Sequence, residues 1–217
     1  MPRSAAANVQ LIDVDRLCGL MLREQLLFIV SRDRLLSRLE QCISEAFGDT
    51  LLITADAERG RPSMLESTER DAFVTQLVKV ATKVQSALSA PGVHGGVLDC
   101  SSFVDDATVV AFTGWLLEYP VVYVHPRPTE SNCLGLEELL LVRAHAVCTH
   151  ERHNELTEES MYLLQSFSLP TSAVDSQHTD VLVKAWQARW GLRFARQQVW
   201  SNLRTTVQHV TLSYVVL

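Results

Sequence analysis

Apolar residues in this sequence are spaced in two ways. Short runs have the length of a buried strand, whereas recurrence every three or four positions is typical of a helix with one buried face. The runs predict strands at residues 26–30, 51–55, 97–98, 121–125, 163–169 and 206–217. The recurrences predict helices at residues 34–47, 67–90, 106–117 and 179–197. Strands that alternate with helices predict an α/β fold, a single domain in which helices flank a mixed β-sheet.

Several segments follow neither spacing clearly, so their secondary structure is predicted from other features. Residues 57–67 combine glycine, proline and several charges, which predicts a mobile loop. Residues 133–136 are expected to return as an antiparallel strand. Residues 139–146 either continue that strand or form a helix, because their periodicity does not separate the two. Residues 1–10 are polar and rich in alanine, which predicts a flexible N-terminal tail before a domain at 11–217.

Composition narrows the class of protein. The 217 residues carry a net charge of −6, with 47% hydrophobic and 20% charged positions, which argues against intrinsic disorder and general nucleic-acid binding. The five cysteines are widely spaced and form no Cys-x-x-Cys pair, as expected for reduced thiols. The apolar stretch at 107–124 is broken by Gly114, Glu118 and Pro120, so no membrane span is expected. We therefore expect a soluble protein of the cytoplasm or nucleus.

Four aspartates form the first candidate site. The sequence holds no glycine-rich phosphate loop, dinucleotide fingerprint or nucleophile elbow, so position alone selects candidates. Asp56 and Asp99 stand at the carboxyl ends of expected strands, and Asp105 and Asp106 follow closely. Open α/β sheets bind ligands at that edge, where paired carboxylates can hold a divalent metal or transfer protons. The alternative is that Asp105 or Asp106 caps a helix and the others are loop acids.

A thiol and an imidazole form the second candidate site. Cys133 follows Asn132 just after a turn, and His125 lies eight residues before Cys133 at the end of a strand. On neighbouring strands the two side chains would act as nucleophile and base. Such an enzyme predicts that Tyr123, Asn132, Cys133 and an acidic residue converge in one pocket. The alternative is a buried cysteine that behaves as a small hydrophobic residue.

Histidine and cysteine also gather near the middle of the C-terminal half. The group consists of His145, Cys148, His150 and His153. Its spacing matches no standard zinc site, so we expect a solvated polar segment and no metal centre here. No motif in the sequence identifies a cofactor.

The helix expected at 179–197 carries the clearest pattern in the chain. Five of its apolar residues fall on one side: Leu182, Val183, Trp186, Trp190 and Phe194. Arg189, Arg193 and Arg196 line one flank of that side, and residues 180–204 carry a net charge of +4, which leaves −10 on the rest. The arginines are candidate ligands for a phosphate or an acidic partner. The alternative is that their stems pack over the rim of the core while their charged heads stay in water.

Several short motifs follow one another in order. They are Glu118-Tyr119-Pro120-Val121-Val122-Tyr123, Asn132-Cys133-Leu134, Ser166-Phe167-Ser168-Leu169-Pro170, Trp186 with Arg193-Phe194, Val210-Thr211-Leu212 and Val216-Leu217. As an ordered set they resemble an uncharacterised eukaryotic family of unknown function, typified by the chromosome 1 open reading frame 74 product. The resemblance implies no activity. It includes Asn132, Cys133 and an acid near Asp105 or Asp106, whereas Asp99 and the 145–153 group do not match it.

These observations favour a non-catalytic module that binds a protein partner or a small anionic ligand. The rival hypothesis is a hydrolase or transferase that uses Cys133, or a site of Asp56, Asp105 and Asp106 with a divalent metal. A third hypothesis is an obligate oligomer whose interface uses the surplus of apolar residues. The sequence alone does not set the oligomeric state.

Overall fold

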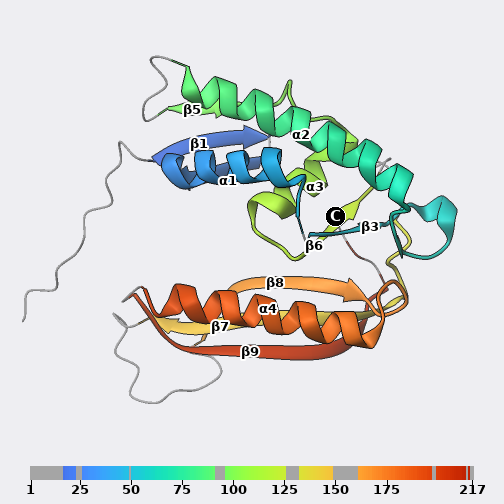
Figure 1. The fold of residues 1–217 in the computed structure, drawn as a ribbon. Helices are drawn as coiled ribbons and strands as arrows, with labels where there is room; N and C mark the ends of the chain where they lie inside the picture. The colour runs from blue at the N-terminus through green and yellow to red at the C-terminus, as the bar shows by residue number, and fades with distance from the viewer. Residues whose placement is uncertain are drawn as a thin grey trace, which may run out of the picture. The chain divides into compact units, whose positions relative to one another are not determined.

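Figure 1 shows the fold in a computed structural model, which describes most of the chain. The described residues are 17–22, 26–48, 50–90, 96–125, 132–148, 161–196, 199–213 and 215. The expected tail at 1–10 lies outside them, as do His150 and His153. The described residues form α-helices and three three-stranded sheets. The predicted α/β class is therefore confirmed.

The chain divides into two compact units, each built from two separate stretches of sequence. Unit 1 comprises residues 1–47 and 75–105, and unit 2 comprises residues 48–74 and 106–217. Helix α2 (Ser67–Ser89) contributes residues to both units. The expectation of one domain over 11–217 stays a prediction.

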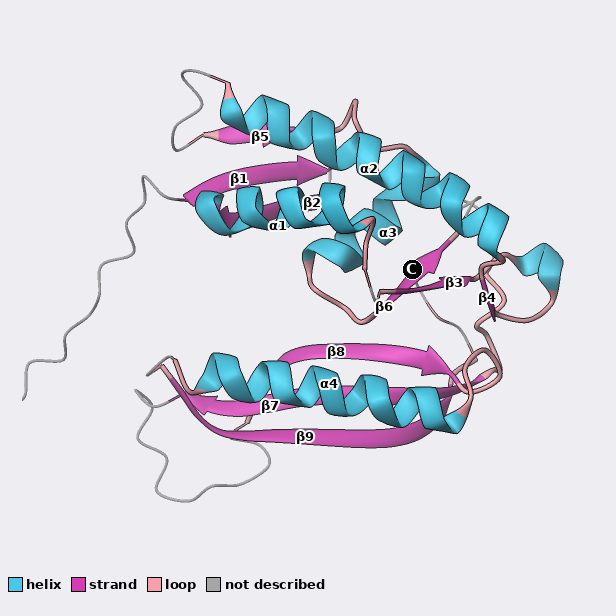
Figure 2. Cartoon of the chain, in the orientation of Figure 1, coloured by secondary structure: helices cyan, strands magenta, loops and turns pink. Residues whose placement is uncertain are grey.

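Unit 1 is a three-stranded sheet with helices. Strand β1 (Leu17–Leu22) lies in the middle, antiparallel to β2 (Leu26–Ser31) and parallel to β5 (Val97–Asp99). Helix α1 (Arg32–Glu45) follows β2 directly and lies beside these strands (Figure 2). Alternate residues of β1 are buried, as a sheet with one covered face requires.

The two helices of unit 1 bury apolar faces and are joined by a hydrogen bond. In α1 the buried residues are Leu35, Leu39 and Cys42, spaced at three and four as predicted. The part of α2 in unit 1 buries a similar face: Leu77, Val80, Ala81, Val84 and Leu88. The Arg32 guanidinium donates to the Leu88 carbonyl at 2.7 Å and links the two helices.

The first sheet of unit 2 is small and partly parallel. Strand β3 (Leu51–Thr54) pairs in parallel with β6 (Val121–Val124) and antiparallel with β4 (Ser63–Met64). The expected loop at 57–67 contains β4 and a short 3₁₀ helix, η2 (Ala57–Arg59). Helix α3 (Asp106–Leu116) packs closely on β6, since a Cβ built at Gly114 would lie 3.3 Å from a methyl group of Val122.

The second sheet of unit 2 consists of three long antiparallel strands under α4. Strand β7 (Glu138–Cys148) lies between β8 (Tyr162–Pro170) and β9 (Trp200–Thr211). Helix α4 (Ser176–Phe194) runs along this sheet (Figure 1). Residues 139–146 are thus a strand, and the terminal strand begins at Trp200 instead of residue 206. Residues 133–136 form turns and no strand, so that prediction was wrong.

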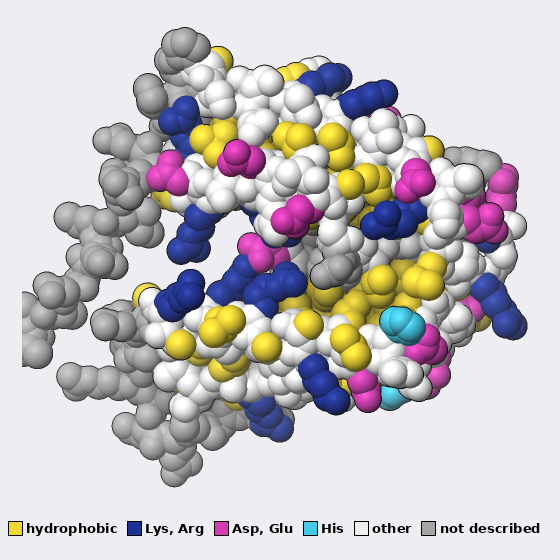
Figure 3. All heavy atoms as spheres, in the orientation of Figure 1, with side chains coloured by type: hydrophobic (Ala, Val, Ile, Leu, Met, Phe, Trp, Pro, Cys, Tyr) yellow, Lys and Arg dark blue, Asp and Glu magenta, His cyan; other side chains and the backbone are white. Residues whose placement is uncertain are grey.

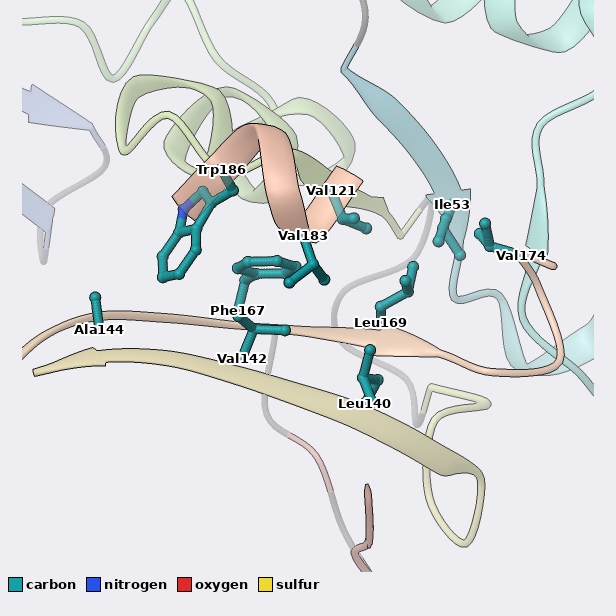
Figure 4. Packing of buried hydrophobic residues seen from close by; sticks show 10 residues of the cluster. All are labelled: Ile53, Val121, Leu140, Val142, Ala144, Phe167, Leu169, Val174, Val183 and Trp186. Atoms are coloured by element: carbon teal, nitrogen blue, oxygen red, sulfur yellow. The ribbon is translucent and has the colours of Figure 1, made fainter. Parts of the chain in front are cut away.

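The core of unit 2 forms where α4, both sheets and the loop after β8 meet. Its buried residues are Ile53, Val121, Leu140, Val142, Ala144, Phe167, Leu169, Val174, Val183 and Trp186. Figure 4 shows Trp186 and Val183 pointing from α4 toward Phe167 of β8. The rings of Trp186 and Phe167 meet edge to face, 5.2 Å between centroids, which is a favoured aromatic geometry. No helix in the described part of the chain is long and apolar enough to cross a membrane.

Candidate functional site

Three stretches of backbone meet at the carboxyl ends of β3 and β6. The Ala55 N–H donates to the Val124 carbonyl at 2.9 Å, and the Cys133 N–H donates to the Ala55 carbonyl at 3.1 Å. Asp56 forms an isolated antiparallel bridge with Asn132. Ligands of open α/β sheets bind at this edge. We call Asp56, Tyr123, Asn132 and Cys133 the Cys133 site.

The Asn132 side chain fixes the loop that carries Cys133. Its Nδ2 donates to the Val215 carbonyl at 2.7 Å, and its Oδ1 accepts from the Leu134 N–H at 3.1 Å. The Leu136 N–H donates to the Leu212 carbonyl at 2.7 Å. Both ends of the Asn132 amide are therefore engaged in tying the loop together. This geometry gives Asn132 a structural role and leaves its amide little freedom to orient a substrate.

The Tyr123 hydroxyl is held within unit 2 as a neutral phenol. It donates to the Ser168 carbonyl at 3.0 Å and lies 3.1 Å from the Ser168 hydroxyl. Burial raises the pKa of Tyr123 to about 12, against the lowering effect of the Ser168 hydrogen bond. The Cys133 thiol adds a smaller rise.

The Cys133 thiol lies in surroundings that keep it protonated. Burial raises its pKa, a hydrogen bond from the backbone lowers it, and the carboxylates of Glu137 and Asp56 raise it further. An activated cysteine needs the opposite, a neighbouring cation or a helix N-terminus that stabilises the thiolate. Asp56 is therefore the acid at this site, but its charge opposes the formation of a nucleophile.

The remaining predicted site residues lie at the ends of β5 and β6, on β7 and at the start of α3. His125 follows β6 and is only 2% exposed, while His145 and Cys148 lie on β7, a strand. Asp106 is the first residue of α3, and Asp105 precedes it. The Asp99 carboxylate accepts from the Ser101 N–H at 2.9 Å, and hydrogen bonds with Ser101 lower its pKa.

A metal centre needs several ligands that converge on one point. Asp56 accepts from the Glu58 N–H at 3.1 Å and so caps η2, a use that matches the loop-acid alternative. Among the described residues, no group of three or more histidine, cysteine or acidic side chains is placed to hold a metal ion. The carboxylate hypothesis for Asp56, Asp105 and Asp106 thus gains no geometric support.

Two of the three predicted arginines of α4 converge on one carboxylate. Arg193 forms a salt bridge with Glu118, and Arg189 lies 3.9 Å from the same carboxylate. The Arg193 guanidinium also lies over the Trp190 ring, 5.6 Å from its centroid, in cation–π geometry. The heads of Arg189 and Arg193 therefore face a carboxylate of the same unit. Arg196 lies exposed just beyond the helix.

The buried face of α4 also contains a polar anchor. The Gln165 Oε1 accepts from the indole N–H of Trp186 at 3.2 Å and from that of Trp190 at 2.9 Å. One side chain of β8 therefore satisfies both indole donors, as buried polar groups require. This anchor fixes how α4 is rotated on the sheet and which residues it turns outward.

The outward side of α4 is apolar as well, which sequence analysis missed. We call Val181, Ala185, Ala188 and Leu192 the outer face of α4. All four are exposed, with Val181 at 65% and Leu192 at 63%. Figure 3 shows hydrophobic side chains in a row along α4, with basic side chains beside them. Its signal in the sequence is the spacing of four, three and four between these residues, which the larger aromatic residues on the opposite side of the helix outweigh.

Most of the sequence also matches one family. Residues 8–217 match the family described as a domain of unknown function, DUF4504. The chain belongs to this family. The DUF4504 match covers both compact units, the Cys133 site and the outer face of α4. No curated protein and no solved structure matches the chain.

Proposed function

We propose that this DUF4504 chain is a non-catalytic protein-binding module. Its docking surface is the outer face of α4, and its partner presents an acidic amphipathic helix. The observation that carries the proposal is the exposed apolar row of Val181, Ala185, Ala188 and Leu192. Exposed aliphatic side chains in a continuous row mark interaction sites more often than isolated ones do.

The spacing of the outer face suits a second helix. Positions separated by four, three and four residues form one seam on a helix, the arrangement that coiled coils use. Val181 and Leu192 stand at the two ends of the seam, with the short side chains of Ala185 and Ala188 between them. Short central residues let a partner helix approach closely while the larger end residues fill its grooves.

Charge beside the seam favours an acidic partner. Lys184 lies on one side and Arg189, which also faces Glu118, lies on the other, while Arg196 follows the end of the helix; all three are exposed. Opposite charges at the flanks of a helix pair set the choice of partner and the rate of association. Glutamates at the flanks of the partner helix would therefore match this surface. In this proposal the anion expected beside the arginines is a glutamate side chain of the partner helix.

The test uses a peptide with leucine at its seam positions and glutamate at its flanks, labelled for fluorescence anisotropy. We expect Leu192→Lys to weaken its binding to the full chain at least about tenfold, because a charge enters the apolar contact. The matched control is Val207→Lys, which alters an exposed valine on β9 and should change affinity less than about twofold.

Three outcomes would contradict the proposal. The peptide fails to bind, the two variants bind it equally well, or a peptide with lysine flanks binds as tightly as the acidic one. Competition by inorganic phosphate that abolishes peptide binding would instead assign the arginines to a small anion. Far-ultraviolet circular dichroism of both variants shows whether they remain folded.

A hydrolase or transferase is the second candidate, favoured by one observation. Backbone contacts at the carboxyl end of β3 involve Asp56, Asn132 and Cys133, which supports this candidate. The raised pKa of the Cys133 thiol weighs against its use as a nucleophile, so we place this candidate below the binding module.

The cellular compartment and the finer family relation also remain proposals. All five cysteines carry free thiols, which is consistent with a reducing compartment such as the cytosol or nucleus. Within DUF4504, the ordered motifs from Glu118 to Leu217 support a relation to the chromosome 1 open reading frame 74 product.

A further inference from the structure

Strand β2 forms an edge of the sheet in unit 1. The order of that sheet is β2-β1-β5, so among the described strands β2 pairs with β1 alone. Its sequence, Leu26–Ser31, contains no charged residue and no proline. Proteins usually protect an edge strand with lysine, proline or a bulge, because an open edge can pair with another chain. Strand β2 lacks the sequence-encoded protections.

The pairing of β1 shows which backbone groups of β2 face the open edge. The Gly19 N–H donates to the Gly96 carbonyl, and the Met21 carbonyl accepts from the Cys100 N–H, so odd-numbered residues of β1 bond toward β5. Its even-numbered residues therefore bond toward β2, whose partners in register are also even-numbered. The N–H and carbonyl groups of Leu27 and Ile29 thus point outward, ready to accept a strand.

The same two residues lie on an exposed apolar face of the sheet. Leu27 is 58% exposed, Ile29 is 73% exposed, and Val97 on β5 is 62% exposed. Register places Ile29 and Val97 on either side of Gly19. An aliphatic face that continues to the open edge would gain burial if the sheet were extended there.

We propose that a second copy of this chain pairs with β2 in antiparallel fashion to form a six-stranded sheet. A two-fold axis perpendicular to the sheet maps each face onto itself and makes the contact closed and self-complementary. The axis passes between Phe28 of the two copies. Leu27 of each copy then lies opposite Ile29 of the other, and these residues exchange both backbone hydrogen bonds. Their side chains bring four aliphatic groups together on the exposed face.

The sequence of β2 supports a second copy as the occupant. The strand carries no charge, so identical copies do not repel each other, and the proposed register places the aliphatic Leu27 opposite the aliphatic Ile29.

The first test measures mass in solution. Sedimentation velocity of the full chain at 1–100 µM, a range chosen around the affinity of modest interfaces, should show a dimer that Ile29→Lys dissociates by at least about tenfold in Kd. Val97→Lys is the matched control, since it places the same charge on an exposed position of the opposite edge strand. A wild-type monomer at every concentration, or a dimer that Ile29→Lys leaves intact, overturns the proposal.

The second test reads the register through a disulfide. Residues paired without hydrogen bonds have Cα atoms about 4.5 Å apart, within the range that a disulfide spans. In a Cys133→Ser/Cys148→Ser background, Phe28→Cys should cross-link two copies on oxidation. Leu26→Cys should not, because its two copies would lie roughly 13 Å apart along the strands. Cross-linking of Leu26→Cys but not of Phe28→Cys contradicts the register.

Ile29→Lys should leave peptide binding by α4 unchanged, which separates this proposal from the proposed function.

Discussion

At the scale of single residues, the Cys133 site is governed by burial. Tyr123 and Cys133 both have raised pKa values because an apolar environment disfavours their charged forms. Catalytic sites counter this effect with a cation, whereas Asp56 and Glu137 reinforce it for Cys133. The site therefore offers two neutral hydrogen-bonding groups at neutral pH, which suits packing and binding better than nucleophilic attack.

We predict that Cys133 reacts as an unactivated thiol. Alkylation by iodoacetamide at pH 7.5, followed by peptide mass spectrometry, should be slower for Cys133 in the native chain than in the chain unfolded by urea. The thiolate is the reactive form, so a raised pKa lowers its fraction, and the rate should still be rising above about pH 8.5, where an ordinary thiol is half ionised.

The raised pKa of Cys133 also makes the stability of the fold depend on pH. Between the unfolded and folded pKa of a thiol, the folded state holds the proton and the unfolded state has lost it, so Cys133 destabilises the fold as pH rises.

Glu137→Gln removes one of the carboxylates that raise the pKa of Cys133 and should speed its alkylation by iodoacetamide. If Cys133 reacts faster in the native chain than in the unfolded chain, the result would instead support an enzyme that uses Cys133 as its nucleophile.

At the scale of secondary structure, α3 ends with a residue in an unusual backbone conformation. The Tyr119 N–H donates to the Gly114 carbonyl at 3.0 Å and the Glu118 N–H donates to the Trp115 carbonyl at 2.9 Å, the two bonds of a Schellman motif. Glu118 occupies the left-handed position of this motif, with φ of 58°, where glycine is the usual residue. Its carboxylate pairs with Arg193 and lies 3.9 Å from Arg189.

Two substitutions at Glu118 separate the ion pairs from the backbone strain. Glu118→Gln should cost up to about 1 kcal/mol of unfolding free energy, because the paired side chains are partly exposed and screened. Glu118→Gly loses the same pairs but relieves a left-handed conformation worth about 1 kcal/mol, so it should be close to wild type. Urea unfolding followed by tryptophan fluorescence measures both.

The control for this prediction is ionic strength. In 1 M NaCl the difference between wild type and Glu118→Gln should shrink, because salt screens exposed charges. If Glu118→Gly destabilises the chain as much as Glu118→Gln does, the left-handed residue carries no strain that glycine relieves.

Sequence patterns predicted those elements whose signal is local. Helix α2 and strand β8 follow directly from apolar spacing and length. Residues 139–146 stayed ambiguous because β7 is a strand only through its pairing with β8 and β9 on both sides. Strand β1 escaped notice, since its six residues pair with segments before and after α2 in the sequence.

The candidate sites show the same division between local and tertiary information. Strand ends placed Asp56 correctly at the sheet edge, but only the folded chain brings Asn132 there through the Asp56 bridge. The arginines of α4 were found from helical spacing, whereas their partner Glu118 lies more than 70 residues earlier. Long-range pairings of this kind leave no periodic trace in the sequence.

At the scale of the whole molecule, α2 is shared by the two compact units. Phe73 and Val74 are buried residues of unit 2, and Leu77 and Leu88 are buried residues of unit 1, all on one continuous helix. A helix forms and melts cooperatively, so loss of structure at one end disfavours the other. We therefore expect the two units to unfold together, as the prediction of a single domain requires.

Leu77→Ala tests this coupling. Leu77 is fully buried in unit 1, and its truncation should cost about 2–5 kcal/mol. All four tryptophans lie in unit 2, so their fluorescence reports on the other unit. Coupled unfolding predicts that the urea midpoint seen by fluorescence falls as far as that seen by circular dichroism. The matched control is Lys79→Ala on the exposed side of α2, and an unmoved fluorescence midpoint for Leu77→Ala would show two independent domains.

The parallel pairing of β3 with β6 has a consequence for how fast the chain folds. Leu51 and Val121 are neighbours in the sheet although about 70 positions separate them, and the second stretch of unit 1 lies within that interval. Closing so large a loop costs entropy before the pairing returns any stability, and folding rates fall as such distant contacts accumulate. Until β6 arrives, one edge of β3 stays unpaired, because β4 pairs only with the other edge. During that interval the open edge of Leu51–Thr54 can pair with another chain, which favours aggregation.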